Sequence, residues 1–321
     1  MTMTLVAAAD IEAAAERIRS VAVRTPILDV DVVRSRQSGS PCSIGLKCEN
    51  FQPMGAFKIR GAYNMIARLS PDLRAAVVIT YSSGNHGQAV ALAAERFRIP
   101  AVVVMPETAP RVKVDGVRRY KGEVIFAGTT SVDRRQRAEA EAAARGLTII
   151  PPFDHPWIIE GAGTCGLEIL EQRPDVPAVY VPVGGGGLIS GVAAAIKGRG
   201  SSARIIGVEP TGAAKMSASR AAGRPVKLDH TSSIADGLLP LRPGDLTFAH
   251  VESFVDDIVT VDDEAIAAAV RWLFREARIV VEPSGAATFA AVFTSTSIAD
   301  GTVAVISGGN VSPEDYGRYI A

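Results

Sequence analysis

The sequence predicts an α/β protein in which parallel strands are joined by crossover helices. Short runs rich in β-branched residues alternate along the chain with longer, alanine-rich amphipathic runs. The β-branched runs are apolar on both faces, as is typical of strands that lie between two layers of helices. With 321 residues, 47% of them hydrophobic, the chain is long enough for roughly two domains and a sizeable core.

The expected elements follow one another in chain order. The first expected helix begins at Asp10, which we assign as its N-cap. Strands are expected at residues 43–49, 75–81, 101–105, 123–128, 147–150, 178–183, 203–209, 256–261 and 302–307. The later helices are expected at residues 57–69, 85–97, 109–120, 131–145, 158–173, 188–198, 262–278, 284–293 and after 312.

The segment PPFDHP, residues 151–156, interrupts this alternation near the middle of the chain. We therefore expect the chain to cross between domains there. Residues 71–152 should form a small mobile domain of their own βα units, and residues 1–70 and 153–321 should form a larger domain. Residues 223–244 are rich in Gly, Pro, Ser and Asp, and a loop of that length is typically functional or mobile.

Charge and composition exclude several classes of function. The 34 basic and 34 acidic residues balance, so we expect no nucleic acid and no membrane as partner, but a small molecule. We also expect no signal peptide, because the N-terminal residues lack a basic segment followed by an apolar core. No apolar run reaches the roughly 18 residues that span a bilayer. The three cysteines have no metal-binding spacing, which fits a cytoplasmic protein.

Four consecutive glycines lie between an expected strand and an expected helix. They are Gly184, Gly185, Gly186 and Gly187. Without Cβ atoms, their backbone N–H groups can converge on an anion, so we favour phosphate binding over a flexible linker. The pattern matches neither GxGxxG nor GxxxxGK[ST], which makes a dinucleotide or a nucleoside triphosphate the weaker interpretation.

Two further turns join a strand to polar residues. In YSSGNHG, Ser82, Ser83, Asn85 and His86 offer hydroxyls, an amide and helix N-terminal N–H groups, which suits a carboxylate. The alternatives are an ordinary cap by Ser83 or Asn85 and a structural role for His86. The second turn places Ser307 and two glycines after the last expected strand.

A single lysine stands out in GAFKIRGA, residues 55–62. Lys58 lies between Phe57 and Ile59, just before an expected helix. Removal from water disfavours the ammonium form, so a neutral amine could attack an aldehyde. The alternative is a lysine whose stem covers an apolar face while its head stays in solvent.

Taken together, these four motifs resemble the fold type II pyridoxal phosphate enzymes, within them the threonine/serine dehydratase and serine racemase branch. Further matches are KCENFQPMGAFKIRGA, GVEP, SIADGL and VEPSGA. The resemblance implies a tryptophan synthase β-like fold of two open, twisted, mostly parallel sheets flanked by helices, with the cofactor in the larger domain. Cysteine synthases share this fold but usually carry an NPxxSxKDR-like motif, and the KIRGA ending here argues against them.

The resemblance also implies a role for each motif residue. Lys58 would bind pyridoxal 5′-phosphate covalently and then remove the substrate Cα proton. The four glycines would bind the phosphate, and Asn85 would donate to the 3′-oxygen of the ring. Phe57 and Glu282 would lie beside the ring, although Glu282 could equally be a helix-dipole acid. Asp236 would support the cofactor or simply form a turn. Ser82, Ser83, Asn85 and His86 would hold the substrate carboxylate.

Ser307 would face the pyridine nitrogen, and a neutral hydroxyl there favours elimination over transamination. We therefore expect an ammonia-lyase (dehydratase) that converts a 3-hydroxy amino acid such as L-threonine or L-serine to a 2-oxo acid and ammonia, with the cofactor phosphate protonating the leaving hydroxide. One alternative is a serine or amino-acid racemase with side elimination, in which Ser83 reprotonates Cα. Others are a dehydratase of hydroxyaspartate or phenylserine or in hydroxyectoine catabolism, and a non-catalytic sensor.

The chain departs from its relatives at a few positions. Ala56 stands where many have serine. Lys215 replaces an aspartate of the metal-binding relatives, so we expect no Mg²⁺ or Ca²⁺ there and expect Lys215 to pair with Glu209. Asp154 and His155 are candidates for setting substrate specificity. We further expect a homodimer or homotetramer, no ACT-like regulatory domain, no feedback by isoleucine, and a catabolic role.

Overall fold

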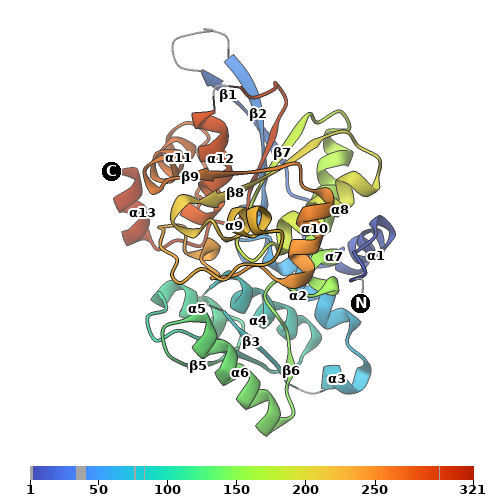
Figure 1. Ribbon diagram of the computed structural model, residues 1–321. Coiled ribbons are helices and arrows are strands. Elements are labelled where there is room, and N and C mark those ends of the chain that lie inside the picture. The colour runs from blue at the N-terminus through green and yellow to red at the C-terminus, as the bar shows by residue number, and fades with distance from the viewer. Residues whose placement is uncertain (1–2, 34–40, 76, 83, 296) are drawn as a thin grey trace.

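The computed structural model describes residues 3–33, 41–75, 77–82, 84–295 and 297–321, arranged as in Figure 1. The strands are β1 Ile27–Val33, β2 Pro41–Cys48, β3 Val78–Tyr81, β4 Ala101–Met105, β5 Glu123–Phe126, β6 Thr148–Ile149, β7 Ala178–Pro182, β8 Arg204–Pro210, β9 Asp257–Val261 and β10 Val303–Ile306. The helices are α1 Ala8–Ile18, α2 Lys58–Arg68, α3 Pro71–Ala75, α4 Asn85–Phe97, α5 Arg111–Arg119, α6 Ser131–Arg145, α7 Pro156–Gln172, α8 Gly187–Gly198, α9 Lys215–Ala222, α10 Asp245–Phe254, α11 Asp263–Arg275, α12 Pro283–Thr294 and α13 Pro313–Ile320. Short 3-10 turns lie at η1 Glu49–Phe51, η2 Thr211–Ala213 and η3 Asp236–Leu238.

Two sheets form the framework of the protein. One has six strands in the order β1-β2-β10-β7-β8-β9, and the other has four in the order β5-β4-β3-β6. The paired strands are parallel in both sheets except that β1 runs antiparallel to β2, with Ile27 opposite Lys47. The predicted α/β fold with two open, mostly parallel sheets is therefore confirmed.

Helices cover both faces of the six-stranded sheet. One face packs against α11, α12 and α13, and the other against α7, α8 and α10. The inner strands β2, β10, β7 and β8 are almost wholly buried, which explains why their sequences are apolar on both sides. All five residues of β7, before the tetraglycine turn, are buried, and so are residues 188–191 after it. This turn therefore lies at the edge of a rigid core.

The four-stranded sheet lies below the first in Figure 1 and has its own covering helices. Along β4, Val102 and Val104 pack against α6, while Val103 and Met105 face α4 and α5. Helix α2 shares a hydrophobic core with α4 and also packs on α7 of the other layer. The core is thus continuous across residue 70, and the division into a domain of residues 71–152 and a domain of residues 1–70 and 153–321 stays a prediction.

Several expected elements differ from those observed. The first helix begins at Ala8, so the assignment of Asp10 as its N-cap is wrong. Asp10 is instead the third helical residue, and its carboxylate accepts the N–H of the true N-cap, Ala7, at 3.1 Å. The sequence did not predict β1, α3, α9 or α10. Within residues 223–244, the turn η3 is the regular element that the structure describes, in line with the expected long loop.

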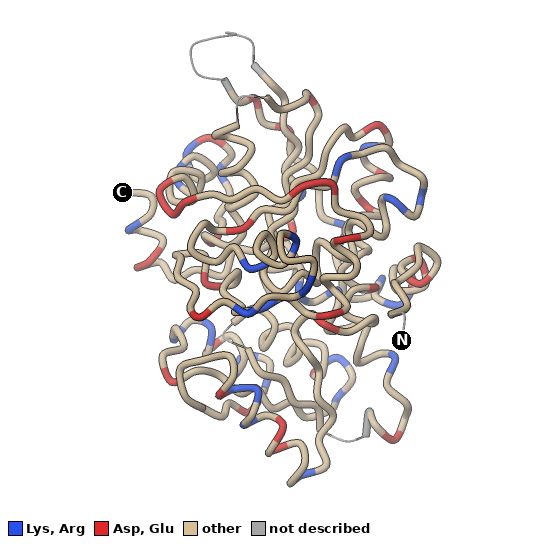
Figure 2. Tube along the Cα trace, viewed as in Figure 1, with Lys and Arg blue, Asp and Glu red and all other residues tan. Residues whose placement is uncertain are grey.

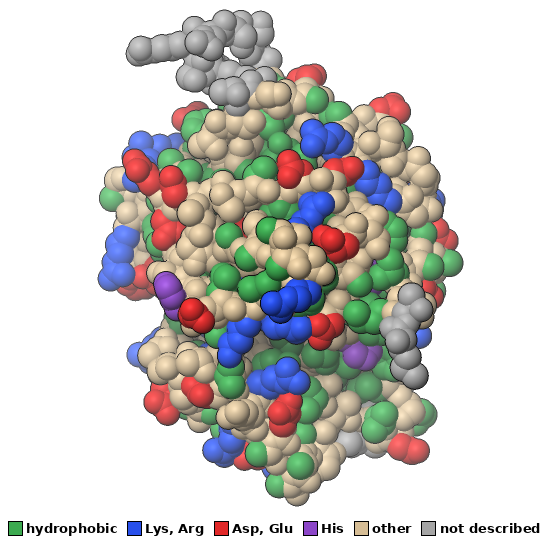
Figure 3. All heavy atoms as spheres, viewed as in Figure 1, with side chains coloured by type: hydrophobic (Ala, Val, Ile, Leu, Met, Phe, Trp, Pro, Cys, Tyr) green, Lys and Arg blue, Asp and Glu red, His purple; other side chains and the backbone are tan. Residues whose placement is uncertain are grey.

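Residues of both charge signs are spread along the chain in Figure 2, and their side chains are seen on the face drawn in Figure 3. This distribution accompanies the equal numbers of basic and acidic residues in the sequence. Within the described part of the chain, no helix combines the length and the apolar character needed to cross a membrane.

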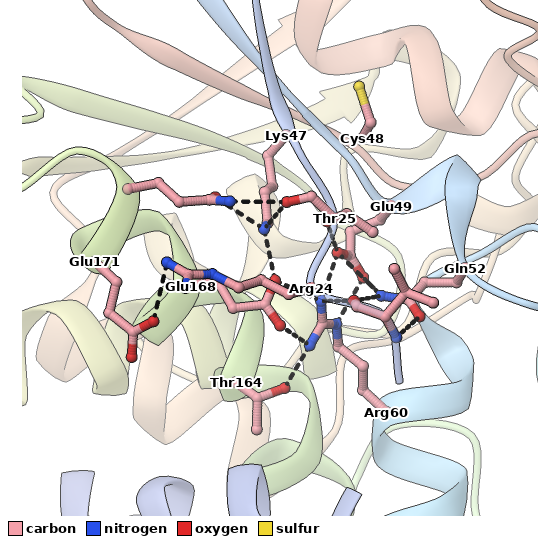
Figure 4. A network of polar contacts seen from close by, with 12 residues as sticks. Arg24, Thr25, Lys47, Cys48, Glu49, Gln52, Arg60, Thr164, Glu168 and Glu171 are labelled. Atoms are coloured by element: carbon pink, nitrogen blue, oxygen red, sulfur yellow. Dashed lines mark hydrogen bonds and ion pairs between the residues drawn. The ribbon is translucent and has the colours of Figure 1, made fainter. Parts of the chain in front are cut away.

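A buried ionic network holds the start of α2 (Figure 4). The guanidinium of Arg60, 1% exposed, binds Glu49 through Nε at 2.7 Å and Nη2 at 2.8 Å, and binds Glu168 of α7 through Nη1 at 2.7 Å. Lys47 of β2 donates to the same Glu168 at 2.6 Å. Burial alone would raise the pKa of Glu49, but Arg60 holds it below its usual value. The carboxylate therefore stays charged, and its partner Arg60 joins η1, which follows β2, to α2 and α7.

Replacing Arg60 with methionine should lower the free energy of unfolding by about 3–5 kcal/mol, because the buried Glu49 carboxylate loses its counter-charge. The measurement is urea unfolding of the holoenzyme. As a control, Arg145→Met removes the exposed ion pair with Glu123 and should cost no more than about 1 kcal/mol. Equal losses in the two variants would contradict this account of the network.

Candidate active site

Four turns predicted from the sequence meet at one place in the fold. The lysine segment forms a β-bridge between Ala56 and Gly308, and the N–H of Phe57 donates to the carbonyl of Ser307 at 3.1 Å. A Cβ atom at Gly308 would lie 2.3 Å from Glu282 Oε1 and 3.2 Å from Asn85 Nδ2. The segments that carry Lys58, Asn85, Glu282 and Ser307 therefore converge around Gly308, which must lack a side chain.

Lys58 is the first residue of α2 and is partly buried. Its Nζ lies 5.1 Å from the centre of the Phe57 ring and donates to the carbonyl of Pro152 at 2.8 Å. Burial lowers the pKa of this amine to about 8. A usable fraction of neutral amine is thus present near neutral pH, as a nucleophile or a base requires.

The tetraglycine turn packs so closely on its surroundings that no side chain fits. A Cβ atom at Gly185 would lie 2.3 Å from the Phe153 ring, and one at Gly184 would lie 2.9 Å from the carbonyl of Gly237. Gly186 has φ +99°, a conformation that side chains disfavour, and it caps the N-terminus of α8. Phe153 packs on Gly185 and Gly187 and follows Pro152 in the chain. The turn therefore lies one residue away from the Pro152 carbonyl, which accepts the hydrogen bond from Lys58.

The first turn of α4 holds Asn85 in a defined orientation. Gly84 is the N-cap, and the Asn85 side chain does not cap the helix. Instead Asn85 Oδ1 accepts from Asn310 Nδ2 at 2.9 Å, and Asn85 Nδ2 donates to Glu282 Oε1 at 2.5 Å. One amide hydrogen of Asn85 is left for a further acceptor.

The other predicted residues of this turn differ in their surroundings. Ser82 Oγ accepts the N–H of Gly84 at 3.1 Å. The His86 ring is buried and contacts the carbonyl of Ile150 at 3.2 Å, and burial lowers its pKa to about 3. The ring is therefore neutral, and the part of His86 that a carboxylate could reach is its backbone N–H in the first turn. Ser83 lies outside the described residues.

Glu282 and Ser307 complete the site on the side of the six-stranded sheet. Glu282 is the N-cap of α12 and is 2% exposed, and burial raises its pKa to about 7. Its Oε2 atom has no hydrogen-bond partner among the described residues. Ser307, 5% exposed, follows β10, and its hydroxyl makes a long contact of 3.5 Å to the carbonyl of Ser284. Both groups can still accept or donate to a ligand.

Asp154 and His155, expected as specificity candidates, have local structural contacts. The Asp154 carboxylate accepts the N–H groups of Asp245, Leu246 and Thr247 at 3.0–3.1 Å and so caps α10. His155 caps α7 by accepting the N–H of Trp157 at 3.1 Å. Their observed contacts thus account for both side chains without a substrate.

Lys215 and Glu209 lie together, as the sequence suggested. Lys215 Nζ, fully buried, is 3.1 Å from Glu209 Oε1 and donates at 2.9 Å to the carbonyls of Val183, Ala213 and Leu238. One ammonium group thus joins the residue before the tetraglycine turn to η2 and η3. Burial lowers the pKa of Lys215, while Glu209 acts to raise it.

Two residues of the site were not singled out in the sequence. Asn310 is the last residue of SGGN, and its position in that motif was a signal that could have identified it. Lys113 of α5 is 5% exposed and forms an ion pair with Asp236 of η3. It lies between Val112 and Val114, the same apolar setting that drew attention to Lys58.

Comparison with known proteins assigns the family. The model for pyridoxal-phosphate dependent enzymes matches residues 18–309. The chain belongs to this family. It is 42% identical to the L-threonine ammonia-lyase of Thermotoga maritima over 97% of this chain and 77% of that protein. It is 39% identical to the serine racemase of Schizosaccharomyces pombe over 97% of this chain and 96% of that protein.

Other relatives extend the range of reactions. The L-threo-3-hydroxyaspartate ammonia-lyase of Saccharomyces cerevisiae is 38% identical over 97% of this chain and 95% of its own length. Among solved structures, maize serine racemase superimposes with a TM-score of 0.90 at 38% identity, over 98% of this chain and 97% of that one. The chain is thus a pyridoxal phosphate enzyme of the threonine dehydratase and serine racemase group.

The residues present fit pyridoxal phosphate. The side-chain-free turn at the N-terminus of α8 suits a phosphate group, which the helix dipole and the free N–H groups both attract. The Lys58 amine suits the aldehyde carbon. The free amide hydrogen of Asn85 and the unpaired Oε2 of Glu282 are polar groups of the kind that a bound ring would satisfy.

Changing Gly185 to alanine should weaken cofactor binding by a factor of about 5 to 150, because overpacking by a Cβ atom against Phe153 costs roughly 1–3 kcal/mol. The measurement is titration of the cofactor-free protein, followed by absorbance. Gly317→Ala is a matched control, since a Cβ atom there meets nothing within 4 Å. A Gly185→Ala affinity within twofold of the parent would be inconsistent with a tightly packed phosphate cradle.

In the cofactor-free protein, Lys58 should react with an acylating reagent at a rate that rises with pH, reaches half its maximum near pH 8 and levels off above about pH 9. The reason is that burial lowers its pKa to about 8, so the neutral amine is fully formed two units earlier than in an ordinary lysine. Peptide mass spectrometry locates the modification. A rate at Lys58 that keeps rising past pH 10 would show an amine in ordinary solvent.

Proposed function

We propose that the protein is a pyridoxal phosphate-dependent ammonia-lyase of the threonine/serine dehydratase type, which converts a 3-hydroxy amino acid to a 2-oxo acid and ammonia. The observation that carries the proposal is Ser307, a neutral hydroxyl beside the lysine segment at the end of β10. No acidic residue occurs between Gly301 and Val311. A neutral partner for the ring nitrogen leaves less charge on the ring and favours loss of a β-substituent.

When bound, pyridoxal phosphate supplies an electron sink that makes the substrate Cα–H bond acidic. In this proposal the Lys58 amine holds the cofactor and then removes the Cα proton. The N–H groups of Gly184–Gly187 would bind the phosphate, Asn85 would donate to the ring 3′-oxygen, and Phe57 and Glu282 would lie beside the ring. Loss of the β-hydroxyl as water gives an enamine, and its imine tautomer adds water to release ammonia and the 2-oxo acid.

The substrate carboxylate would bind at the start of α4. Helix α4 has 13 residues, and its first-turn N–H groups and dipole attract an anion. Ser82, Ser83, Asn85 and His86 are the residues proposed to bind it. The carboxylate and the phosphate would then lie at the N-termini of two different helices, α4 and α8, and the position of Lys58 beside Pro152 places its amine near the tetraglycine turn.

A second candidate function is amino-acid racemisation with side elimination. It is favoured by the match to fission yeast serine racemase over nearly the full length of both chains. In that reaction Ser83 would return a proton to Cα from the face opposite Lys58. A third substrate class, hydroxyaspartate, is suggested by the yeast L-threo-3-hydroxyaspartate ammonia-lyase.

The reaction is tested with a panel of 3-hydroxy amino acids, namely L-serine, L-threonine, L-threo-3-hydroxyaspartate and phenylserine. We expect ammonia and the matching 2-oxo acid from at least one of them, faster than the D-isomer forms. Lys58→Ala should lower the rate by at least about a thousandfold, because it removes both the anchor and the base. Release of D-isomer without any 2-oxo acid would replace the lyase by the racemase.

We also propose a cytoplasmic location and a homodimer or homotetramer. Cys48 and Cys165 are buried free thiols, as is usual in a reducing compartment. Burial raises the pKa of Cys48 to about 12, which makes this thiol unreactive.

A further inference from the structure

Lys113 is a buried cation that the proposed reaction does not use. It lies in the first turn of α5, on the four-stranded sheet, and is 5% exposed. A lysine is seldom this deeply buried unless its charge is paired. Its position therefore needs an explanation beyond the stability of α5.

The ammonium group of Lys113 contacts the part of the chain that covers the six-stranded sheet. Its Nζ forms an ion pair with Asp236 Oδ2 in η3, and it interacts electrostatically with Glu282 at the start of α12. The remaining carboxylate oxygen of Asp236 lies 3.5 Å from Ser284 Oγ, which in turn accepts the N–H of Gly237 at 2.8 Å. One cation thus meets two carboxylates that belong to the other layer.

The stem of Lys113 lies directly against the turn that carries Asn85. A Cβ atom at Gly84 would lie 2.6 Å from Lys113 Cδ and 3.2 Å from Nζ. On the other side, the carbonyl of Gly237 lies against Gly184 of the tetraglycine turn. Lys113 and η3 therefore form a continuous packed connection between the start of α4 and the start of the phosphate cradle.

We propose that Lys113 is a positioning residue that holds the α4 turn of the four-stranded sheet against Asp236 and Glu282 of the six-stranded sheet. The inference deepens the proposed function, on which its kinetic part rests. Lys113 does not itself touch the reacting atoms. It fixes the distance between the group that would bind the substrate carboxylate and the groups that would bind the cofactor.

The ion pair also sets the charge around Asn85. Glu282 accepts the Asn85 amide, and Lys113 is the positive group beside that carboxylate. Without Lys113, Asp236 and Glu282 would lose the cation beside them, and the ion pair that holds η3 against α5 and the α4 turn would be gone. The effect should be a turn that is misplaced for substrate, with the phosphate cradle itself intact.

The test is a double-mutant cycle in the holoenzyme with Lys113→Met, Asp236→Asn and the double variant. Each single change should raise KM about tenfold and change kcat and cofactor affinity less than threefold. Because both changes break the same contact, the KM of the double variant should be no higher than the KM of the more impaired single variant. Arg111→Met is the matched control on the same helix, since its pair with Asp115 is exposed and 3.6 Å long.

Amide hydrogen exchange tests the contact between Lys113 and η3 without requiring the enzyme to turn over a substrate. In Lys113→Met, amides of η3 and of the first turn of α4 should exchange about tenfold faster, and those of α8 should not change. Multiplicative effects in the cycle, or unchanged exchange in η3, would overturn the inference. If the parent enzyme releases no ammonia from any amino acid while Lys113→Met still loosens η3 and the α4 turn, the proposed function fails and the positioning contact stands.

Discussion

The position of Lys58 depends on a guanidinium group two residues further along the chain. Arg60 and Lys58 share the first turn of α2, and Arg60 is bound by carboxylates from the end of β2 and from α7. A planar guanidinium with two-point contacts resists both rotation and sliding of the helix. The carbonyl of Pro152 can therefore meet the Lys58 amine at 2.8 Å although α2 rests on two different layers. A buried ionic network of the protein thus lies next to the site.

Around this fixed helix, the site is assembled from the ends of strands. Turns after β3, β7 and β10 carry the amide, the glycines and the hydroxyl, in keeping with the rule that ligands of open α/β sheets bind beyond the carboxyl ends of the strands. Close contacts around the site involve Gly84, Gly184, Gly185 and Gly308, where a Cβ atom would clash. Close approach of backbones, more than long side chains, gives the site its shape.

Local signals were enough for the fold and for the motif turns, but not for contacts across the chain. Helix α6 was predicted with its observed bounds, and the residues that cap its two ends, Thr130 and Gly146, directly flank it in the sequence. Helix α10 was missed because its cap, Asp154, lies 91 residues away from Asp245. Strand β1 was missed because its exposed Asp29 and Asp31 break the apolar run that marks buried strands. Asn310 and Lys113 likewise gain their meaning only from partners that folding brings near.

The ammonium group of Lys215 has a consequence for the environment in which the protein can work. It donates to the carbonyls of Val183, Ala213 and Leu238, and it is covalently part of the same chain. A cation attached by its own side chain cannot be diluted, exchanged or removed by a chelator, and its local concentration is the same in every copy of the protein. The three loops around the tetraglycine turn therefore keep their arrangement whatever the salt composition of the surrounding medium.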